Sequence, residues 1–256
     1  MSFAAPAESY ECYMGRYSRR LAPLFADFAG VRPGMRVLDV GCGPGPLAEA
    51  LAEQLGQERV AAADPSAAFA TVCAARLPGA DARRAHAERL PWADGSFDAA
   101  LAQLVVNFMR DPVAGVGEMR RVVRSGGTVA ACVWDYRERM GMLRAFWDAA
   151  LELDPQAPDE GRTMRFQDPD ELHRLWLDVG LEGVRTEALE VDRLYQSFDD
   201  YWLPFTTGIG PGGGYWESLS PEAREALRER CRRRLGDPDG AFRLPARAWA
   251  VRGTRA

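Results

Sequence analysis

A glycine turn directly after an apolar strand is the segment of this sequence best suited to bind a ligand. Residues 37–47 read VLDVGCGPGPL, with glycine at Gly41, Gly43 and Gly45. Alternate glycines let the backbone come closer to a ligand than any side chain would permit, and they adopt turn dihedrals at little steric cost. Asp39 adds a carboxylate that would repel a pyrophosphate and attract a cation. The segment therefore predicts a site for a nucleotide-like ligand with positive groups.

Pro46 separates this turn from the dinucleotide-binding fingerprint. That fingerprint reads G-x-G-x-x-G, and its third glycine would fall where this chain has Pro46. Proline suits the first turn of a helix, because the N–H that it lacks would have no intrahelical partner there. The turn therefore predicts a helix that begins at Pro46 and disfavours a nicotinamide-dependent oxidoreductase.

Residues 37–45 resemble motif I (hhDxGxGxG) of the class I S-adenosylmethionine-dependent methyltransferases, and further segments follow in the family's order. Asp64, after the apolar residues 60–63, resembles the acidic residue at the end of the family's second strand. Residues 85–92 (AHAERLPW) resemble the GDAExLPF segment that lines the adenine, and residues 94–98 (DGSFD) resemble the DxSFD lead into the fourth strand.

A fifth segment, residues 118–127 (EMRRVVRSGG), is similar to the family's helix and turn before the fifth strand. Five motifs in order over residues 37–135 are far more specific than one glycine turn. The resemblance implies the family's fold, with S-adenosylmethionine as the cofactor.

The resemblance also implies which residues hold each part of the cofactor. Asp39 and the backbone of Gly41–Gly43 would receive the methionine end, with Asp39 as the charge partner. Asp64, flanked by Pro65 and Ser66, would accept both ribose hydroxyls, because a carboxylate has two oxygens and no proton to donate at neutral pH. The alternative for Asp64 is a helix N-cap, although Ser66 is the more natural cap.

His86 departs from the family, which usually has an aspartate that accepts from the adenine amino group. Histidine accepts only as a neutral tautomer, and it would otherwise stack on the base. Arg16 and Tyr17 would either touch the cofactor or pack within a helix. The predicted cofactor-binding residues are Arg16, Tyr17, Asp39, Gly41, Cys42, Gly43, Asp64, Pro65, Ser66, His86, Ala87, Glu88 and Gln103.

Hydrophobic periodicity indicates an α/β fold. We expect one domain over residues 1–256, with a Rossmann-like, seven-stranded, mostly parallel sheet and helices on both faces. Its parts are an N-terminal helical cap, a cofactor-binding core and two substrate-side insertions, at 1–30, 31–135, 136–170 and 195–240. The expected strands are 35–40, 60–64, 82–85, 97–104, 128–134, 184–191 and 242–251. The expected helices are 10–28, 46–55, 67–75, 113–123, 137–153 and 168–178.

An insertion, residues 198–235, separates the last two expected strands. Its predicted loop, residues 208–214, is rich in glycine and is flanked by the aromatic residues Trp202, Phe205, Tyr215 and Trp216. This pattern is typical of a lid over a substrate, and equally of a connector whose aromatic residues are buried as packing.

Methyl transfer by in-line displacement needs alignment more than it needs a catalytic side chain. A hydroxyl acceptor would call for a base above the fourth and fifth strands, where Asn107, Trp134, Asp135 and Tyr136 are the nearest candidates. His173 is expected on a solvated helix face and is left outside the site.

The composition of the chain disfavours several classes of function. The 256 residues carry a net charge of −5, which disfavours nucleic acid as a partner. The five cysteines are scattered without a C-x-x-C pair, which predicts neither a disulfide framework nor a metal site. An apolar signal-peptide core and an apolar run of membrane-spanning length are both lacking, so we expect a cytoplasmic protein without membrane contact.

The expected function is methyl transfer to a small molecule, and an aromatic or polyketide-like acceptor would suit an enclosed aromatic pocket. One alternative is a protein of the same fold that binds S-adenosylmethionine for another reaction or for none. The other is the nicotinamide-dependent oxidoreductase disfavoured above.

Overall fold

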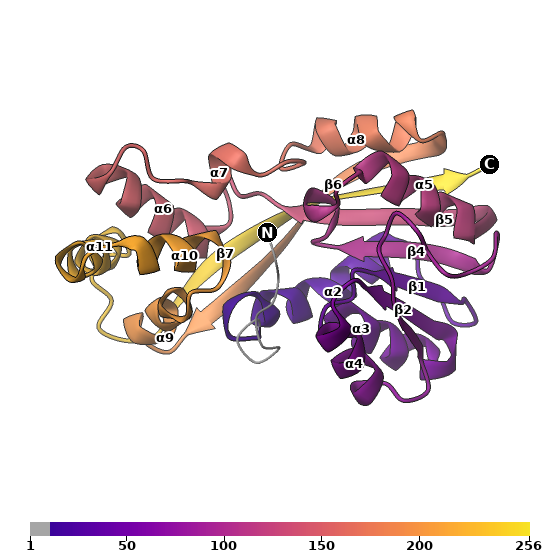
Figure 1. Cartoon of the computed structure of the whole chain (residues 1–256), viewed down its shortest axis with the longest axis horizontal. Coiled ribbons are helices and arrows are strands. Elements are labelled where there is room, and N and C mark those ends of the chain that lie inside the picture. Colours follow the sequence, from indigo (N-terminus) through magenta and orange to yellow (C-terminus); the bar gives the residue numbers. More distant parts are fainter. Residues whose placement is uncertain (1–10) are drawn as a thin grey trace.

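Seven strands form one sheet in the computed structural model, which describes residues 11–256 (Figure 1). Their order is β3-β2-β1-β4-β5-β7-β6, and β7 runs antiparallel to both of its neighbours while the other pairs are parallel. The strands are β1 (Val37–Val40), β2 (Val60–Asp64), β3 (Asp81–Arg84), β4 (Phe97–Gln103), β5 (Val123–Trp134), β6 (Leu181–Tyr195) and β7 (Phe242–Arg255). The predicted Rossmann-like, mostly parallel sheet is confirmed.

Helices cover both faces of the sheet (Figure 1). α5 (Pro112–Val122) and α8 (Pro169–Asp178) contact each other on one side, and α2 (Arg16–Phe28) and α3 (Pro46–Leu55) contact each other on the other. The central strands β1, β2 and β4 consist mainly of buried Val, Leu and Ala, as strands covered on both faces require. None of the helices within residues 11–256 is both long and apolar enough to cross a bilayer.

The remaining helical elements are short or lie in the second half of the chain. They are η1 (Glu11–Gly15), η2 (Gln57–Arg59), α4 (Ala67–Arg76), η3 (Val106–Phe108), α6 (Gly141–Leu153), α7 (Glu160–Thr163), α9 (Phe198–Trp202), η4 (Leu203–Thr207), α10 (Gly210–Ser218) and α11 (Pro221–Arg234). The predicted helix starts at Pro46 and after Asp168 are confirmed. Tyr10, the predicted start of the N-terminal helix, lies outside the described residues together with residues 1–9 of the predicted cap.

Two predicted boundaries around the fifth strand are wrong. β5 begins at Val123, so residues 125–127 form an irregularity inside the strand, where the register passes from Phe97↔Val123 to Ala99↔Thr128. The helix expected from residue 137 begins at Gly141. Asp135 delays it, because its carboxylate accepts from the N–H of Glu138 (2.9 Å) and holds a turn.

The last two strands are longer than predicted. They pair continuously from Tyr195↔Phe242 toward Leu181↔Arg255, with one register shift after Glu182. Many β6 side chains are exposed, so the strand lacks the apolar run that marks β1 or β2. Figure 1 shows one end of the β6–β7 pair beside α6, α9, α10 and α11, at the end of the molecule away from β1 and β2.

The glycine-rich segment predicted as a loop is mostly helix, because α10 begins at Gly210. A Cβ on Gly212 would lie 3.2 Å from the ring of Phe205, and a Cβ on Gly213 would lie 2.7 Å from the backbone of Gly208. These glycines therefore allow close packing of α10 against the neighbouring turn.

Candidate functional site

The glycine turn lies at the carboxyl end of β1. The N–H groups of Gly41 and Cys42 both donate to the carbonyl oxygen of Ala63 in β2 (2.7 and 3.0 Å). Gly41 has a φ of +74°, and an added Cβ would lie 2.5 Å from the side chain of Val105. Gly43 has a φ of +53°, and there a Cβ would meet no atom of the described residues within 4 Å. Gly41 thus allows close packing, whereas the backbone of Gly43 borders space that a ligand can approach.

Asp39 is a buried carboxylate at this turn. Its side chain is 1% exposed, and its Oδ2 has no hydrogen-bond partner within residues 11–256. Burial raises the pKa of Asp39 to about 8, and the charge of Asp64 acts in the same direction. A carboxylate in this setting is suited to a cationic group brought by a ligand.

Asp64 ends β2 and fixes the glycine turn. Its two carboxylate oxygens accept from the N–H of Gly43 (2.9 Å) and the N–H of Ser66 (2.8 Å). Burial raises the pKa of Asp64, and these N–H groups and the nearby charge of His86 oppose that shift. The helix cap is Ser66, whose hydroxyl accepts from the N–H of Phe69 (3.4 Å). The N-cap alternative for Asp64 is therefore wrong.

The segment after β3 contains both exposed and buried residues. His86 is exposed and lies near Asp64, and Ala87 is buried. The carboxylate of Glu88 accepts from the N–H groups of Arg110 (2.9 Å) and Asp111 (3.3 Å). The side chain of Glu88 thus holds the turn that begins α5, and the predicted contact of this segment with a cofactor stays a prediction.

Gln103 connects the end of β4 to the N-terminal helix. Its Nε2 donates to the carbonyl oxygen of Ser18 in α2 (3.1 Å), while its buried Oε1 has no partner in the described part of the chain. Leu104, the next residue, has a φ of +63°, which is rare for leucine and turns the backbone sharply at the end of the strand.

Arg16 and Tyr17 both have protein partners. Arg16 forms an ion pair with Asp200 of α9 (3.1 Å). The hydroxyl of Tyr17 lies 3.1 Å from that of Tyr195, and its ring meets Trp134 edge to face. These contacts dock the N-terminal helix onto β6, the end of β5 and α9, which agrees with the packing alternative for these residues.

The base candidates after β4 and β5 differ in what occupies their polar atoms. Asn107 Nδ2 lies 3.5 Å from the Tyr136 hydroxyl and 3.8 Å from Met164 Sδ, and its Oδ1 has no partner among residues 11–256. Asp135 pairs with Arg247, whose Nε donates over 2.9 Å. Asp135 is thus occupied by structural contacts, whereas Asn107 retains a free acceptor.

Two further residues, Tyr13 and Glu160, lie near these candidates, and Tyr13 belongs to the segment YMGRY (residues 13–17) that resembles an N-terminal lead-in of some family members. Tyr13 in η1 is buried, and its hydroxyl has no partner among the described residues. Burial raises the pKa of Tyr13, and the charge of Glu160 acts in the same direction, which places the two side chains near each other. Sequence reasoning missed Glu160, because no motif or periodicity marks it.

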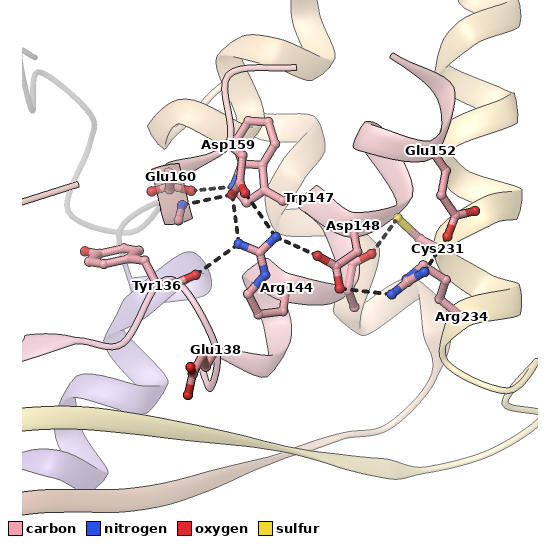
Figure 2. A network of polar contacts seen from close by, with 12 residues as sticks. Tyr136, Glu138, Arg144, Trp147, Asp148, Glu152, Asp159, Glu160, Cys231 and Arg234 are labelled. Carbon is pink, nitrogen blue, oxygen red and sulfur yellow. Dashed lines mark hydrogen bonds and ion pairs between the residues drawn. The ribbon is translucent and has the colours of Figure 1, made fainter. Parts of the chain in front are cut away.

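Polar contacts around α6 hold Glu160 in position (Figure 2). Trp147 Nε1 donates to Glu160 Oε2 (2.9 Å). Arg144 donates to Asp159 (2.8 Å), to the carbonyl oxygen of Tyr136 (3.0 Å) and to Asp148 (2.6 Å). One arginine therefore joins α6, the end of β5 and the start of α7.

Comparison with known proteins connects this geometry to a family. A family model described as a methyltransferase domain matches residues 38–131. The chain is 34% identical over 119 residues to a demethylmenaquinone methyltransferase of Renibacterium salmoninarum, covering 46% of this chain and 49% of that protein. It is 32% identical over 173 residues to a ubiquinone biosynthesis O-methyltransferase of Dinoroseobacter shibae, covering 64% and 67%. The match thus spans about half to two thirds of these relatives.

Comparison with solved structures shows a similar fold. A protein of Anabaena variabilis, assigned to methyl transfer in an antibiotic biosynthesis pathway, superimposes with a TM-score of 0.61 at 19% identity, over 92% of this chain and 96% of that one. At this identity the likeness concerns the fold. Together with the matched family model and the ubiquinone relative, it shows that this chain belongs to the class I S-adenosylmethionine-dependent methyltransferases.

Proposed function

We propose that this chain transfers the methyl group of S-adenosylmethionine to a small aromatic acceptor. The observation that carries the proposal is a group of buried polar atoms without partners in the described residues, near the carboxyl ends of β1, β4 and β5. They are Tyr13 Oη, Asp39 Oδ2, Gln103 Oε1, Asn107 Oδ1 and Trp134 Nε1. Folded proteins rarely leave such atoms unpaired, so bound molecules are their natural partners.

The cofactor side of the site fits S-adenosylmethionine. The unpartnered oxygen of Asp39 suits the ammonium of the methionine end, and the open space at Gly43 admits the ligand beside the backbone. Asp64 is oriented by two N–H groups and keeps lone pairs for the ribose hydroxyls. When bound, this cofactor supplies a methyl carbon made electrophilic by a positively charged sulfur.

Asp64→Ala is expected to weaken S-adenosylmethionine binding by about 1 to 3 kcal/mol, which corresponds to roughly 5- to 150-fold in Kd. The variant loses charge-assisted hydrogen bonds to the ribose, and Gly43 loses the acceptor that holds it. Isothermal titration calorimetry measures the change. Asp239→Ala, at an exposed position, is the control. Affinity equal to that of the control variant would remove Asp64 from the site.

The acceptor side of the site is built from the second half of the chain. Phe146 stacks on Phe205 with ring centroids 4.3 Å apart, and Tyr13 meets Phe205 edge to face at 6.0 Å. An aromatic acceptor would suit a site beside these buried aromatic side chains, and by their names one relative above acts on demethylmenaquinone and the other in ubiquinone biosynthesis. We therefore assign cofactor binding to residues 31–135 and acceptor binding to residues 136–170 and 195–240, with the insertion as the lid.

The main task of these residues in the reaction is alignment. Holding two reactants in line and apart from water accounts for roughly 7 to 11 kcal/mol of barrier reduction in favourable cases. Asp39 and Asp64 would fix the cofactor from the β1 and β2 side, and the aromatic side chains would fix the acceptor from the α6 side.

The direct test is methyl transfer from isotopically labelled S-adenosylmethionine to a panel of hydroquinones, simple phenols, polycyclic phenols and aromatic amines, followed by mass spectrometry. The expected result is one panel member that gains a single labelled methyl. Tight S-adenosylmethionine binding with no methylated product across the panel would contradict the proposed acceptor class and favour a protein of this fold with another reaction.

A further inference from the structure

Glu160 is a buried carboxylate placed at the carboxyl ends of β4 and β5 by the segment that follows α6. Its side chain is 4% exposed. The same segment contacts both strand ends, since Met164 Sδ lies 3.8 Å from Asn107 Nδ2 and Arg165 donates to the carbonyl oxygen of Asn107 (3.2 Å). The segment also lies against Tyr136, which follows β5, because a Cβ on Gly161 would lie 3.0 Å from the carbonyl oxygen of Tyr136.

The carboxylate of Glu160 is oriented without being neutralised. Trp147 Nε1 donates to Oε2 over 2.9 Å, and among residues 11–256 no arginine forms an ion pair with it. Arg144, the arginine nearest in the network, directs its donors to Tyr136, Asp148 and Asp159. Figure 2 shows Glu160 and the ring of Tyr136 to one side of Arg144, and Asp148 and Arg234 to the other.

The groups around Glu160 favour a carboxylate that can take up a proton near neutral pH. Burial raises the pKa of Glu160 to about 7, with the Trp147 hydrogen bond and Arg144 lowering it and Asp159 raising it. Tyr13 of η1 lies near enough for the charge of Glu160 to raise the pKa of its hydroxyl, and this hydroxyl has no partner in the described residues. Tyr136, from the end of β5, lies near Tyr13 and within 3.5 Å of Asn107 Nδ2.

Unpartnered polar atoms and buried aromatic side chains both lie in the segments near this carboxylate. Tyr13 Oη and Asn107 Oδ1 are both buried and unpartnered in the described residues. Trp147, the donor to Glu160, is in contact with Phe146 and Tyr215. An aromatic ring bearing a hydroxyl would bring an apolar face for these aromatic side chains, a donor for Glu160 and acceptor lone pairs for Tyr13.

We infer that Glu160 is the catalytic base and that the acceptor is a phenol-type hydroxyl methylated on oxygen. The inference rests on the proposed function. Glu160 takes the proton of the acceptor hydroxyl while the oxygen forms a bond to the methyl carbon. The C–S bond breaks with its electron pair left on sulfur, which becomes a neutral thioether. The proton on Glu160 is then released to solvent.

Glu160→Gln tests this role because glutamine keeps the size of the side chain and an oxygen for Trp147 but cannot act as a base. We expect kcat to fall by about 100- to 10,000-fold with a phenol that is neutral at the assay pH. The Kd for S-adenosylmethionine by calorimetry should stay within about twofold. The rise of kcat with pH near 7 should disappear, and Glu160→Asp should restore part of the rate. Glu152→Gln is the matched control, since Glu152 forms surface ion pairs with Arg230 and Arg234.

A second acceptor separates base catalysis from a structural effect. A nitrophenol that is already ionised at the assay pH needs no base, so its methylation by Glu160→Gln should stay within about tenfold of wild type. Equal losses with both phenols would overturn the inference, as would a variant that retains the wild-type rate and pH profile. Wild-type transfer to nitrogen or carbon alone would also overturn it. Wild-type protein that methylates nothing would overturn the proposed function as well, and that outcome is visible before any variant is made.

Discussion

Asp39→Asn is expected to weaken S-adenosylmethionine binding and, at the same time, to raise the thermal unfolding temperature. Asparagine keeps the shape of the side chain but has no charge to pair with the ammonium of the cofactor. Loss of a buried charge partner of this kind weakens the binding free energy by about 2 to 3 kcal/mol, which raises Kd roughly 30- to 150-fold. Binding is measured by calorimetry, with Asp239→Asn at an exposed position as the control.

The gain in stability follows from the raised pKa of Asp39. That pKa rises from an ordinary 3.8 to about 8 in the folded chain, mainly through burial. Between these values the unfolded chain has lost a proton that the folded chain keeps, so the free energy of unfolding of the wild type falls as pH rises from about 4 to about 8. Asparagine does not titrate, so the free energy of unfolding of the Asp39→Asn variant should exceed that of the wild type by an amount that grows over that pH range. An advantage that shrinks with rising pH, or unchanged cofactor affinity, would contradict this role for Asp39.

Asp159→Ala is expected to lower the free energy of unfolding by about 3 kcal/mol, the lower end of the range for breaking a buried ion pair. The side chains of Arg144 and Asp159 are 12% and 6% exposed, and their ion pair is 2.8 Å long. Without Asp159, Arg144 keeps Asp148 as its one ionic partner among the described residues, and the N–H of Gly161 loses its acceptor. The start of α7, and with it Glu160, should loosen.

Urea denaturation of three variants tests this. Asp199→Ala breaks an ion pair in which the aspartate is 79% exposed, and it should lose at most about 1 kcal/mol. Adding Arg144→Met to Asp159→Ala removes the partly buried charge left without its partner and should recover part of the loss. A loss for Asp159→Ala no larger than that for Asp199→Ala would show that the Arg144 network contributes little to stability.

The cofactor half of the fold was predictable because its signals are local. The strand, turn and helix around Gly41 are determined within about twenty residues, and Pro46 marks the helix start that the structure has. The local pattern placed Asp39 and Asp64 near the ends of two strands, and the resemblance to the family implied that both belong to one cofactor site. The pairing of Asp64 with the N–H of Gly43 follows once β1 and β2 lie side by side.

The acceptor half was less predictable because its contacts are long-range. β6 has too few buried residues for its length to be predicted from an apolar pattern. The glycines of α10 allow close packing, and from the sequence alone such glycines look the same as those of a flexible loop. Glu160 is held near the strand ends by long-range contacts, among them those of Trp147 with Glu160 and of Met164 with Asn107. Glu88 shows the opposite case, a motif residue whose carboxylate supports α5.

The most direct test of the central claim is a calorimetric titration of the chain with S-adenosylmethionine, S-adenosylhomocysteine and NADH, repeated on Asp64→Ala. We expect both adenosyl ligands to bind, NADH not to bind, and the Asp64→Ala variant to bind the adenosyl ligands more weakly. Binding of NADH alone, or the absence of binding by either adenosyl ligand, would contradict the cofactor site described above.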